Sequence, residues 1–283
     1  MGFVTEFLQE MRSAIFSLRM QQRMRRRIAA LRSQQRQLQT ESIVRPARTL
    51  TIVVPCYGHS QFMKTMVESI AMQTRPPDEV VFVNDCSPDE TLKTLECSIA
   101  EFDLRNRTRC VVLNNVRNLG QAASLNAGIE TATSDVAMVL NDDDCVLHDA
   151  VAITLRVLRM RPHIRMFGGQ CTLFDDDRAL ALYNKELLKV WSVDEIPMQE
   201  FYPKDTLRYR KSNDLNITHS GCSFYKESWR EVGGYCVDKR ARLIPYSDRD
   251  FQLRFNVRFP IAVLGVPISF WRSNSSVDAG LNS

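Results

Sequence analysis

The chain has 283 residues, of which 44% are hydrophobic and 25% charged, and its formal net charge is +4. These values are typical of a soluble globular protein with one main domain, and no apolar run approaches the roughly 20 residues that span a bilayer. The eight cysteines are scattered without zinc-ligand spacing, so they are expected to be reduced thiols in a reducing compartment.

Residues 1–48 are predicted to form a separate basic helical arm. They hold ten Arg, no Lys and three Glu, a net charge of +7. Apolar residues recur with helical spacing, but the apolar stripe changes face near residues 19–21. Two interpretations stay open: contact with an anionic membrane surface, or packing against a second copy or the rest of the chain. Nucleic-acid binding is not expected, because no aromatic residue is interleaved with the Arg cluster 23–27.

From residue 49, apolar runs alternate with helical patterns. The apolar runs predict strands, and the segments between them predict helices. A parallel sheet covered by helices on both faces follows from this alternation, so the fold class is α/β. The predicted strands are 49–54, 79–84, 109–113 and 136–140, and the predicted helices are 61–73, 89–102, 121–131 and 150–159.

Polar side chains follow each of these strands. In parallel sheets, ligands bind beyond the carboxyl ends of the strands, so these loops are expected to form one nucleotide site. Asp142, Asp143 and Asp144 come directly after a buried strand. Adjacent carboxylates repel one another, and a divalent cation such as Mn²⁺ or Mg²⁺ gives a reason to gather them. The alternative is a solvated acidic turn before the next helix.

Residues 50–146 hold four motifs in order, namely Val53–Gly58, Val83–Ser87, Asn118–Gly120 with Asn126–Ile129, and Leu140–Asp144. The second half of the chain holds Ser220–Lys226, Glu231–Tyr235 and Ser247–Arg254. The first four motifs resemble the nucleotide-binding half of a family-two glycosyltransferase with the GT-A fold, and the second half of the chain is similar to the acceptor side of that family. Two positions depart from the family pattern, namely Asn141 in the metal motif and Ser247 before the expected base.

The resemblance implies a metal-dependent inverting transfer of one sugar, hexose or N-acetylhexosamine, from a nucleotide diphosphate sugar, expected to be a UDP-sugar. It divides the body into a donor half, residues 49–146, and an acceptor half, residues 147–283. Asp143 and Asp144 are then the expected metal ligands, and Asp248 is the expected general base. The expected donor-binding residues are Pro55, Tyr57, Asp85, Asn118, Gly120, Asn126 and Asp142. Among them, Asp85 is expected to accept from the uracil imide, and Tyr57 to stack on the base.

The acceptor is expected to be a glycan or a lipid-linked glycan in the assembly of a surface polysaccharide. Asp250, Trp191 and Tyr202 are its candidate contacts, since aromatic faces suit sugar rings. The four histidines, His59, His148, His163 and His219, are isolated and are interpreted as structural. The expected location is the cytoplasm, or the inner face of the membrane if the arm binds there. The alternative function is a catalytically silent sugar-nucleotide-binding subunit that docks through the arm.

Overall fold

The structure, a computed structural model, describes residues 47–174, 197–203 and 217–273. The predicted arm lies outside the described residues except for its last two positions, and Trp191 lies outside them as well. Membrane or subunit contact through the arm therefore stays a prediction. Within the described ranges, no helix combines the length and the hydrophobicity needed to cross a bilayer.

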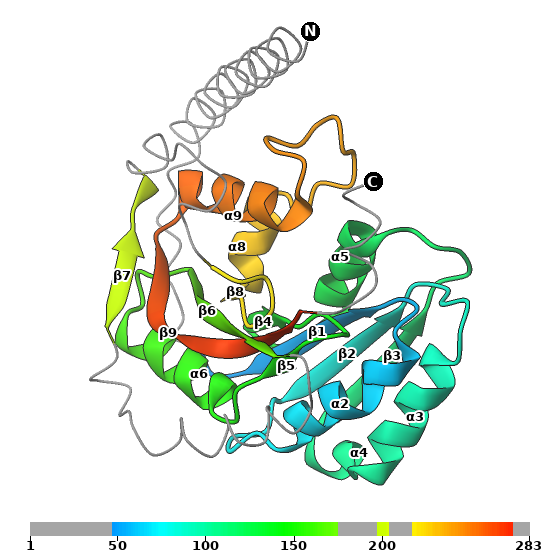
Figure 1. The fold of residues 1–283 in the computed structure, drawn as a ribbon. Coiled ribbons are helices and arrows are strands. Elements are labelled where there is room, and N and C mark those ends of the chain that lie inside the picture. Colours follow the sequence, from blue (N-terminus) through cyan, green and yellow to red (C-terminus); the bar gives the residue numbers. More distant parts are fainter. Residues whose placement is uncertain (1–46, 175–196, 204–216, 274–283) are drawn as a thin grey trace, which may run out of the picture.

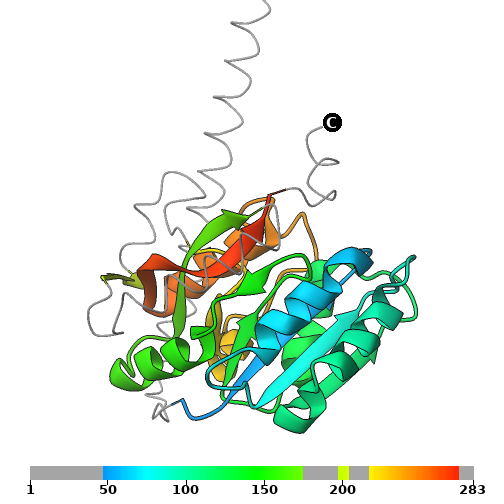
Figure 2. The same cartoon turned by 60° about the horizontal axis from the view of Figure 1, so that its bottom comes forward.

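The segment 49–146, which we call the donor half, forms the predicted parallel sheet. Its strands lie in the order β3–β2–β1–β4, and each neighbouring pair is parallel (Figures 1 and 2). In the centre, Val53 lies opposite Val81 on one side and Val139 on the other. The bounds are β1 Leu50–Cys56, β2 Glu79–Asn84, β3 Arg109–Asn114 and β4 Val136–Val139.

Two hydrophobic layers cover the sheet, and successive β1 residues alternate between them. Ile52 and Val54 pack into the layer that contains residues of α2, α3, α4 and α6, whereas Val53 packs into the layer of α5, α8 and α9. Figure 1 shows these two groups of helices on opposite sides of the sheet. The helices are α2 Met63–Ala71, α3 Thr91–Glu101, α4 Leu104–Arg107, α5 Gln121–Thr131, α6 Ala150–Met160, α8 Lys226–Glu231 and α9 Ser247–Arg258.

Helix α5 packs directly against the sheet at Gly128. A Cβ atom added at Gly128 would lie 2.5 Å from Val53 Cγ1 and 3.0 Å from Val83 Cγ2, so any larger residue would push the helix away. This close approach positions the start of α5 next to the carboxyl ends of β1 and β2.

The predicted helix at 61–73 is shorter in the structure. Residues Ser60–Phe62 form a 3₁₀ turn, η1, and α2 ends at Ala71. Gln73 leaves the helix because its buried side chain donates to Leu147 O (2.8 Å) and accepts from Val151 N (3.1 Å). The helix predicted from residue 89 begins at Thr91, because the Asp89 carboxylate accepts from the backbone N–H of Thr91 (3.1 Å).

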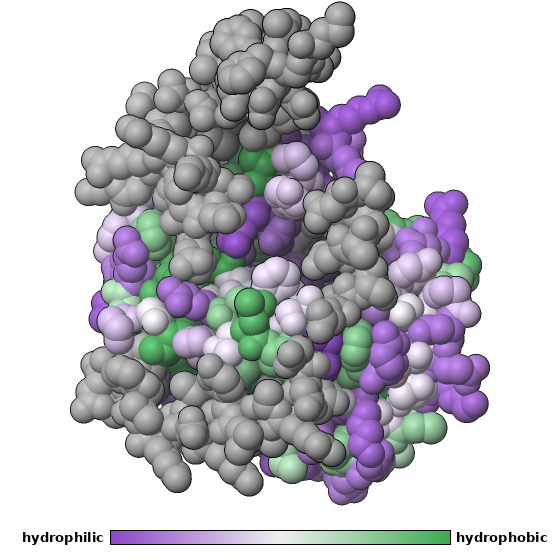
Figure 3. Space-filling model, in the orientation of Figure 1, coloured by the Kyte–Doolittle hydropathy of each residue, from purple (hydrophilic) through white to green (hydrophobic). Residues whose placement is uncertain are grey.

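The segment from residue 147 onward, which we call the acceptor half, continues the same sheet with mixed strand directions. β8 (Ser223–Tyr225) is antiparallel to both β4 and β6 (Met166–Phe174), and β6 is parallel to β9 (Ile261–Arg272). β5 (Cys145–Val146) and β7 (Met198–Phe201) pair antiparallel with β9. All eight cysteines lie in the described ranges, and none of them forms a disulfide there. On the face shown in Figure 3, hydrophilic residues cover the side that α3 occupies in Figure 1.

Candidate active site

The loops that follow β1, β2 and β4 meet at one edge of the sheet, as parallel pairing requires. The backbone N–H of Tyr57, after β1, donates to Asp142 Oδ2 (2.8 Å), after β4. The N–H of Gly58 donates to Ser87 Oγ (3.3 Å), after β2. Gly58 has a φ of +71°, a left-handed conformation that suits glycine and turns the chain back over the sheet edge. We call this region the donor edge.

The three adjacent carboxylates have three different environments. Asp142 is buried, and its second oxygen, Oδ1, lies 2.8 Å from His59 Nδ1. Asp144 is also buried, and it accepts from the Ser220 hydroxyl, the Arg272 N–H (3.1 Å) and the Asn141 side-chain amide (3.2 Å). Asp143 is half-buried, and no described residue donates a hydrogen bond to its carboxylate. Asp143 therefore offers the carboxylate that is most available to a ligand.

Burial and mutual repulsion shift the ionisation of this group. Burial, reinforced by the charge of Asp143, raises the pKa of Asp144 to about 7. Burial also raises the pKa of Asp142, although the hydrogen bond from His59 opposes the shift. The same hydrogen bond raises the pKa of His59. A bound cation would lower the pKa of Asp142 and Asp144 again, because a positive charge stabilises the ionised carboxylates.

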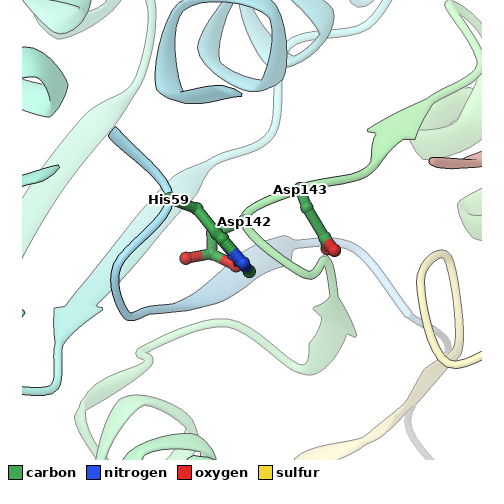
Figure 4. A group of neighbouring side chains, drawn as sticks. All are labelled: His59, Asp142 and Asp143. Atoms are coloured by element: carbon green, nitrogen blue, oxygen red, sulfur yellow. The ribbon is translucent and has the colours of Figure 1, made fainter. Parts of the chain in front are cut away.

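Within the described ranges, one group of side chains could hold a metal ion: His59, Asp142 and Asp143, whose ligand atoms lie within 4.8 Å of one another. Figure 4 shows the His59 and Asp142 side chains next to each other, with Asp143 on the same loop as Asp142. An imidazole nitrogen and carboxylate oxygens are donors that Mn²⁺ accepts, so the set fits the expected ion. The structure groups Asp143 with Asp142 and His59, and Asp144 is not part of this group. Both oxygens of Asp144 are engaged by protein groups, as are both oxygens of Asp142.

Asp85 holds the loop at the start of α5. Its Oδ1 accepts from the Asn115 side chain (2.7 Å) and the Leu119 N–H (2.8 Å), and its Oδ2 accepts from the Gly120 N–H (2.7 Å). The Asn118 side chain also accepts from the Gly120 N–H (3.0 Å), and Gly120 has a φ of +84°. Asp85 thus has a structural role in this structure, and the uracil contact expected from the sequence stays a prediction.

The other predicted donor-binding residues differ in exposure. Tyr57 is 43% exposed at the donor edge, where it is accessible to a ligand, whereas Pro55 is buried within β1 opposite Val83. Asn126 pairs with the backbone of Tyr235 in both directions: Nδ2 donates to Tyr235 O, and Tyr235 N donates to Oδ1, both at 2.8 Å. Asn126 therefore joins α5 to the acceptor half through its whole amide group.

The two acids at the start of α9 also contrast. Asp248 is half-buried, its nearest charged partner is Arg249 Nε at 4.0 Å, and no described residue donates a hydrogen bond to its carboxylate. Asp250 is 0% exposed and accepts from the Leu243 N–H (2.6 Å) and Arg254 Nε (2.8 Å). Asp250 is therefore not on an open surface where an acceptor could contact it.

The segment 217–222 connects Asp248 with the acidic loop. Arg249, next to Asp248, donates to Ile217 O (2.7 Å), and Ser220, three residues further along this segment, donates to Asp144. Between them lies His219, whose pKa is lowered by burial, while the charge of Asp248 opposes that shift. These contacts place Asp248 beside the donor edge, across a short segment.

Tyr202 lies at the other end of the sheet. It follows β7, whose Phe201 pairs with Ile261, the first residue of β9, and its hydroxyl donates to Glu200 (2.6 Å). Arg272, the last residue of β9, contacts Asp144. A twelve-residue strand thus separates Tyr202 from the donor edge, which does not favour the acceptor contact expected from the sequence.

Comparison with known proteins decides the family. The family model described as "Glycosyl transferase family 2" matches residues 51–233, more than half of the chain. The chain belongs to glycosyl transferase family 2. A relative from Erwinia amylovora, the amylovoran biosynthesis glycosyltransferase AmsE, is 26% identical over 61% of this chain and 58% of its own length. The chain thus spans just over half the length of AmsE, and it spans 28% of the length of a poly-β-1,6-N-acetyl-D-glucosamine synthase from Staphylococcus aureus.

Solved structures share the fold of this family 2 chain. Residues 1–349 of the Staphylococcus aureus protein TarS, in complex with UDP, align with a TM-score of 0.59 and 16% identity, covering 80% of this chain and 60% of that TarS fragment. The Pyrobaculum calidifontis mannosyltransferase PcManGT, in complex with GDP-Man and Mn²⁺, aligns with a TM-score of 0.57 and 16% identity, covering 93% and 71%. The predicted α/β class and GT-A fold are confirmed by these alignments.

Three residues of this family 2 site were missed by reasoning from the sequence. His59 was interpreted as structural, yet it bonds Asp142. Ser220 was noted only as part of a motif, yet it bonds Asp144. Arg272 is buried between the rings of Phe62 and Phe174, at 4.2 and 4.4 Å from their centroids, and its Nε donates to Asp143 O (3.1 Å). The only signal in the sequence was the position of His59 directly after the Val53–Gly58 motif.

Proposed function

We propose that the protein is a metal-dependent inverting glycosyltransferase that moves one sugar from a nucleotide diphosphate sugar to a glycan or lipid-linked glycan. The observation that carries this proposal is a contrast in bonding. Asp142, Asp144 and Asp250 are engaged by protein donors, whereas the carboxylates of Asp143 and Asp248 have no hydrogen-bond donor among the described residues. A metal ligand and a general base both need such an available carboxylate.

In this mechanism the donor edge binds the nucleotide diphosphate, and Asp143, with Asp142 beside it, would hold Mn²⁺ or Mg²⁺. The bound ion would supply positive charge next to the diphosphate leaving group. Asp248 accepts the proton of the acceptor hydroxyl while the oxygen of that hydroxyl bonds to the anomeric carbon. The bond from that carbon to the diphosphate oxygen breaks, and its electron pair leaves with the nucleotide. Attack opposite the leaving group inverts the anomeric configuration.

The choice of donor and pathway rests on similarity. TarS was solved with UDP and with UDP-GlcNAc, and PcManGT with GDP-Man and Mn²⁺. AmsE is described as acting in amylovoran biosynthesis, and a poly-β-1,6-N-acetyl-D-glucosamine synthase also matches this chain. These relatives support a sugar nucleotide as donor and polysaccharide or glycolipid assembly as the setting, with a UDP-sugar as the proposed donor.

Donor hydrolysis across a panel of UDP-, GDP-, CDP- and dTDP-sugars, with Mn²⁺, Mg²⁺ or EDTA, tests the proposal. We expect hydrolysis of a UDP-sugar that requires the metal and is lost in Asp143→Ala. Turnover that is equal in EDTA would contradict the metal, and preference for another base would contradict the UDP donor. Nucleotide binding without turnover on any donor, with a panel of acceptor glycans added, would instead indicate a silent binding subunit.

A further inference from the structure

His59 lies where the loop after β1 turns over the donor edge. It is only 6% exposed, and its backbone N–H donates to Thr91 Oγ1 (3.1 Å), which fixes the residue against the start of α3. Its ring lies 5.8 Å from that of Phe62, which is itself covered by the Arg272 guanidinium. The position of the imidazole is therefore fixed by the backbone contact with Thr91 and by the ring contact with Phe62.

The two nitrogens of this imidazole differ. Nδ1 lies 2.8 Å from Asp142 Oδ1, while Nε2 is buried and has no partner in the described part of the chain. A buried polar atom without a partner costs about 1–3 kcal/mol of stability, so an apolar residue here would be favoured if packing alone mattered. Among the residues that the structure describes, the ring makes its one polar interaction with Asp142, which points to a role at that carboxylate.

Asp142 is held from two sides by the same short loop. His59 Nδ1 contacts Oδ1, and the Tyr57 N–H donates to Oδ2, each at 2.8 Å. A carboxylate fixed at both oxygens has lost most of its rotational freedom before any ligand binds. Such preorganisation lowers the entropic cost of binding, because the ligand does not have to order the side chain.

We propose that His59 is a positioning residue, which donates from Nδ1 to Asp142 and so fixes that carboxylate at the donor edge for the incoming nucleotide sugar. The inference rests on the proposed function, since it assumes that a nucleotide binds at this edge. It assigns His59 an effect on nucleotide binding that acts through Asp142, with little effect on the chemical step.

Two amide variants separate this role from simple packing. In His59→Asn the side-chain nitrogen can take about the position of Nδ1 and still donate to Asp142, whereas in His59→Gln the nitrogen extends further, towards the place of Nε2. With Mn²⁺ present, we expect His59→Gln to weaken UDP binding by about tenfold, the scale of a lost hydrogen bond to a charged group. His59→Asn should stay within about threefold of wild type. For both, kcat should change less than the donor KM.

A double-mutant cycle tests whether the effect passes through Asp142. In an Asp142→Ala background, adding His59→Gln should not weaken UDP binding further. Additive losses would overturn the proposal, because His59 would then contact the nucleotide independently. Equal UDP affinity of wild type and both His59 variants would overturn it too. His163→Gln, at an exposed histidine that contacts Glu200, is the matched control and should leave binding unchanged.

The wild-type protein supplies a test that needs no variant. Pulsed electron paramagnetic resonance of the Mn²⁺–UDP complex detects imidazole nitrogen bound directly to the ion. We expect no such nitrogen signal, and a signal that disappears on ¹⁵N-labelling of histidine would show that His59 is a metal ligand and would overturn the positioning role. If wild type binds no nucleotide at all, it is the proposed function that fails, a result distinguishable from unchanged affinity in the variants.

Discussion

The donor half and the acceptor half differ in how far the sheet determines the position of a polar side chain. In the donor half, parallel strands bring Tyr57, Asp85 and Asp142 to one edge, although they are far apart in sequence. In the acceptor half, strand directions are mixed, and the predicted residues separate: Asp248 lies beside the donor edge, and Tyr202 lies at the far end of β9. The sheet therefore does not show which predicted residues of the acceptor half act together, and each of them has to be tested separately.

The largest effect is expected at Asp248. Asp248→Asn keeps the shape of the side chain but removes its basicity, so sugar transfer should fall by roughly 10²–10⁴. UDP affinity should stay unchanged, because the donor edge is intact. Steady-state transfer kinetics and calorimetry with UDP measure the two quantities. Near-normal turnover would place the base outside the start of α9.

Asp250 should affect stability instead of rate. Its buried carboxylate faces Arg254, and Asp250→Asn would leave that guanidinium without its charged partner. Breaking a buried ion pair costs about 3–5 kcal/mol, and because Arg254 keeps its bonds to Val232 O and Gly234 O, a value near 3 kcal/mol is expected. Urea unfolding measures the loss. A stable Asp250→Asn protein with no turnover would restore the acceptor role that the sequence suggested.

A substitution at Asn126 tests the contact between the donor half and the acceptor half. Removing its amide in Asn126→Ala leaves the N–H and C=O of Tyr235 unpaired, and we expect a loss of about 1–3 kcal/mol in unfolding free energy. Nucleotide affinity should change less than threefold, since both arms of the amide are already used within the protein. A large loss of UDP affinity at unchanged stability would identify Asn126 as a donor contact, as the family resemblance implied.

The fold was predictable from the sequence, and so was the meeting of the polar loops at one edge of the sheet, but the environments of adjacent residues were not. Apolar runs separated by helical patterns determine a parallel sheet, and a parallel sheet determines which loops meet. The run Asp142–Asp144 shows the limit. Asp144 is engaged by Ser220 and Arg272, which are 76 and 128 residues away in the sequence. No local pattern indicates which of three neighbouring carboxylates will receive such distant donors.

The histidines also show that the partners of a side chain cannot be predicted from the local sequence. His59 and His219 are isolated in the sequence, and both were interpreted as structural. The structure places His59 on Asp142 and His219 on the Tyr235 hydroxyl (3.2 Å). An interpretation from residue type alone could not separate them, because their partners come from other strands and loops.

The smallest effect is expected at His219, and it depends on pH. Burial lowers the pKa of His219 below 6.5, with the charge of Asp248 opposing and that of Arg249 reinforcing the shift. The unfolded chain then binds a proton more readily than the folded chain, so stability is lost as pH falls below about 6.5. One group contributes at most about 1.4 kcal/mol per pH unit.

His219→Gln keeps a polar partner for Tyr235 and cannot titrate. The difference in unfolding free energy between wild type and this variant should therefore narrow from pH 7.5 to 5.5. Urea unfolding at several pH values measures this difference, in which all other titrating groups cancel. Parallel stability curves for the two proteins would mean that His219 has the same pKa in the folded and the unfolded chain, which would contradict the effect of burial.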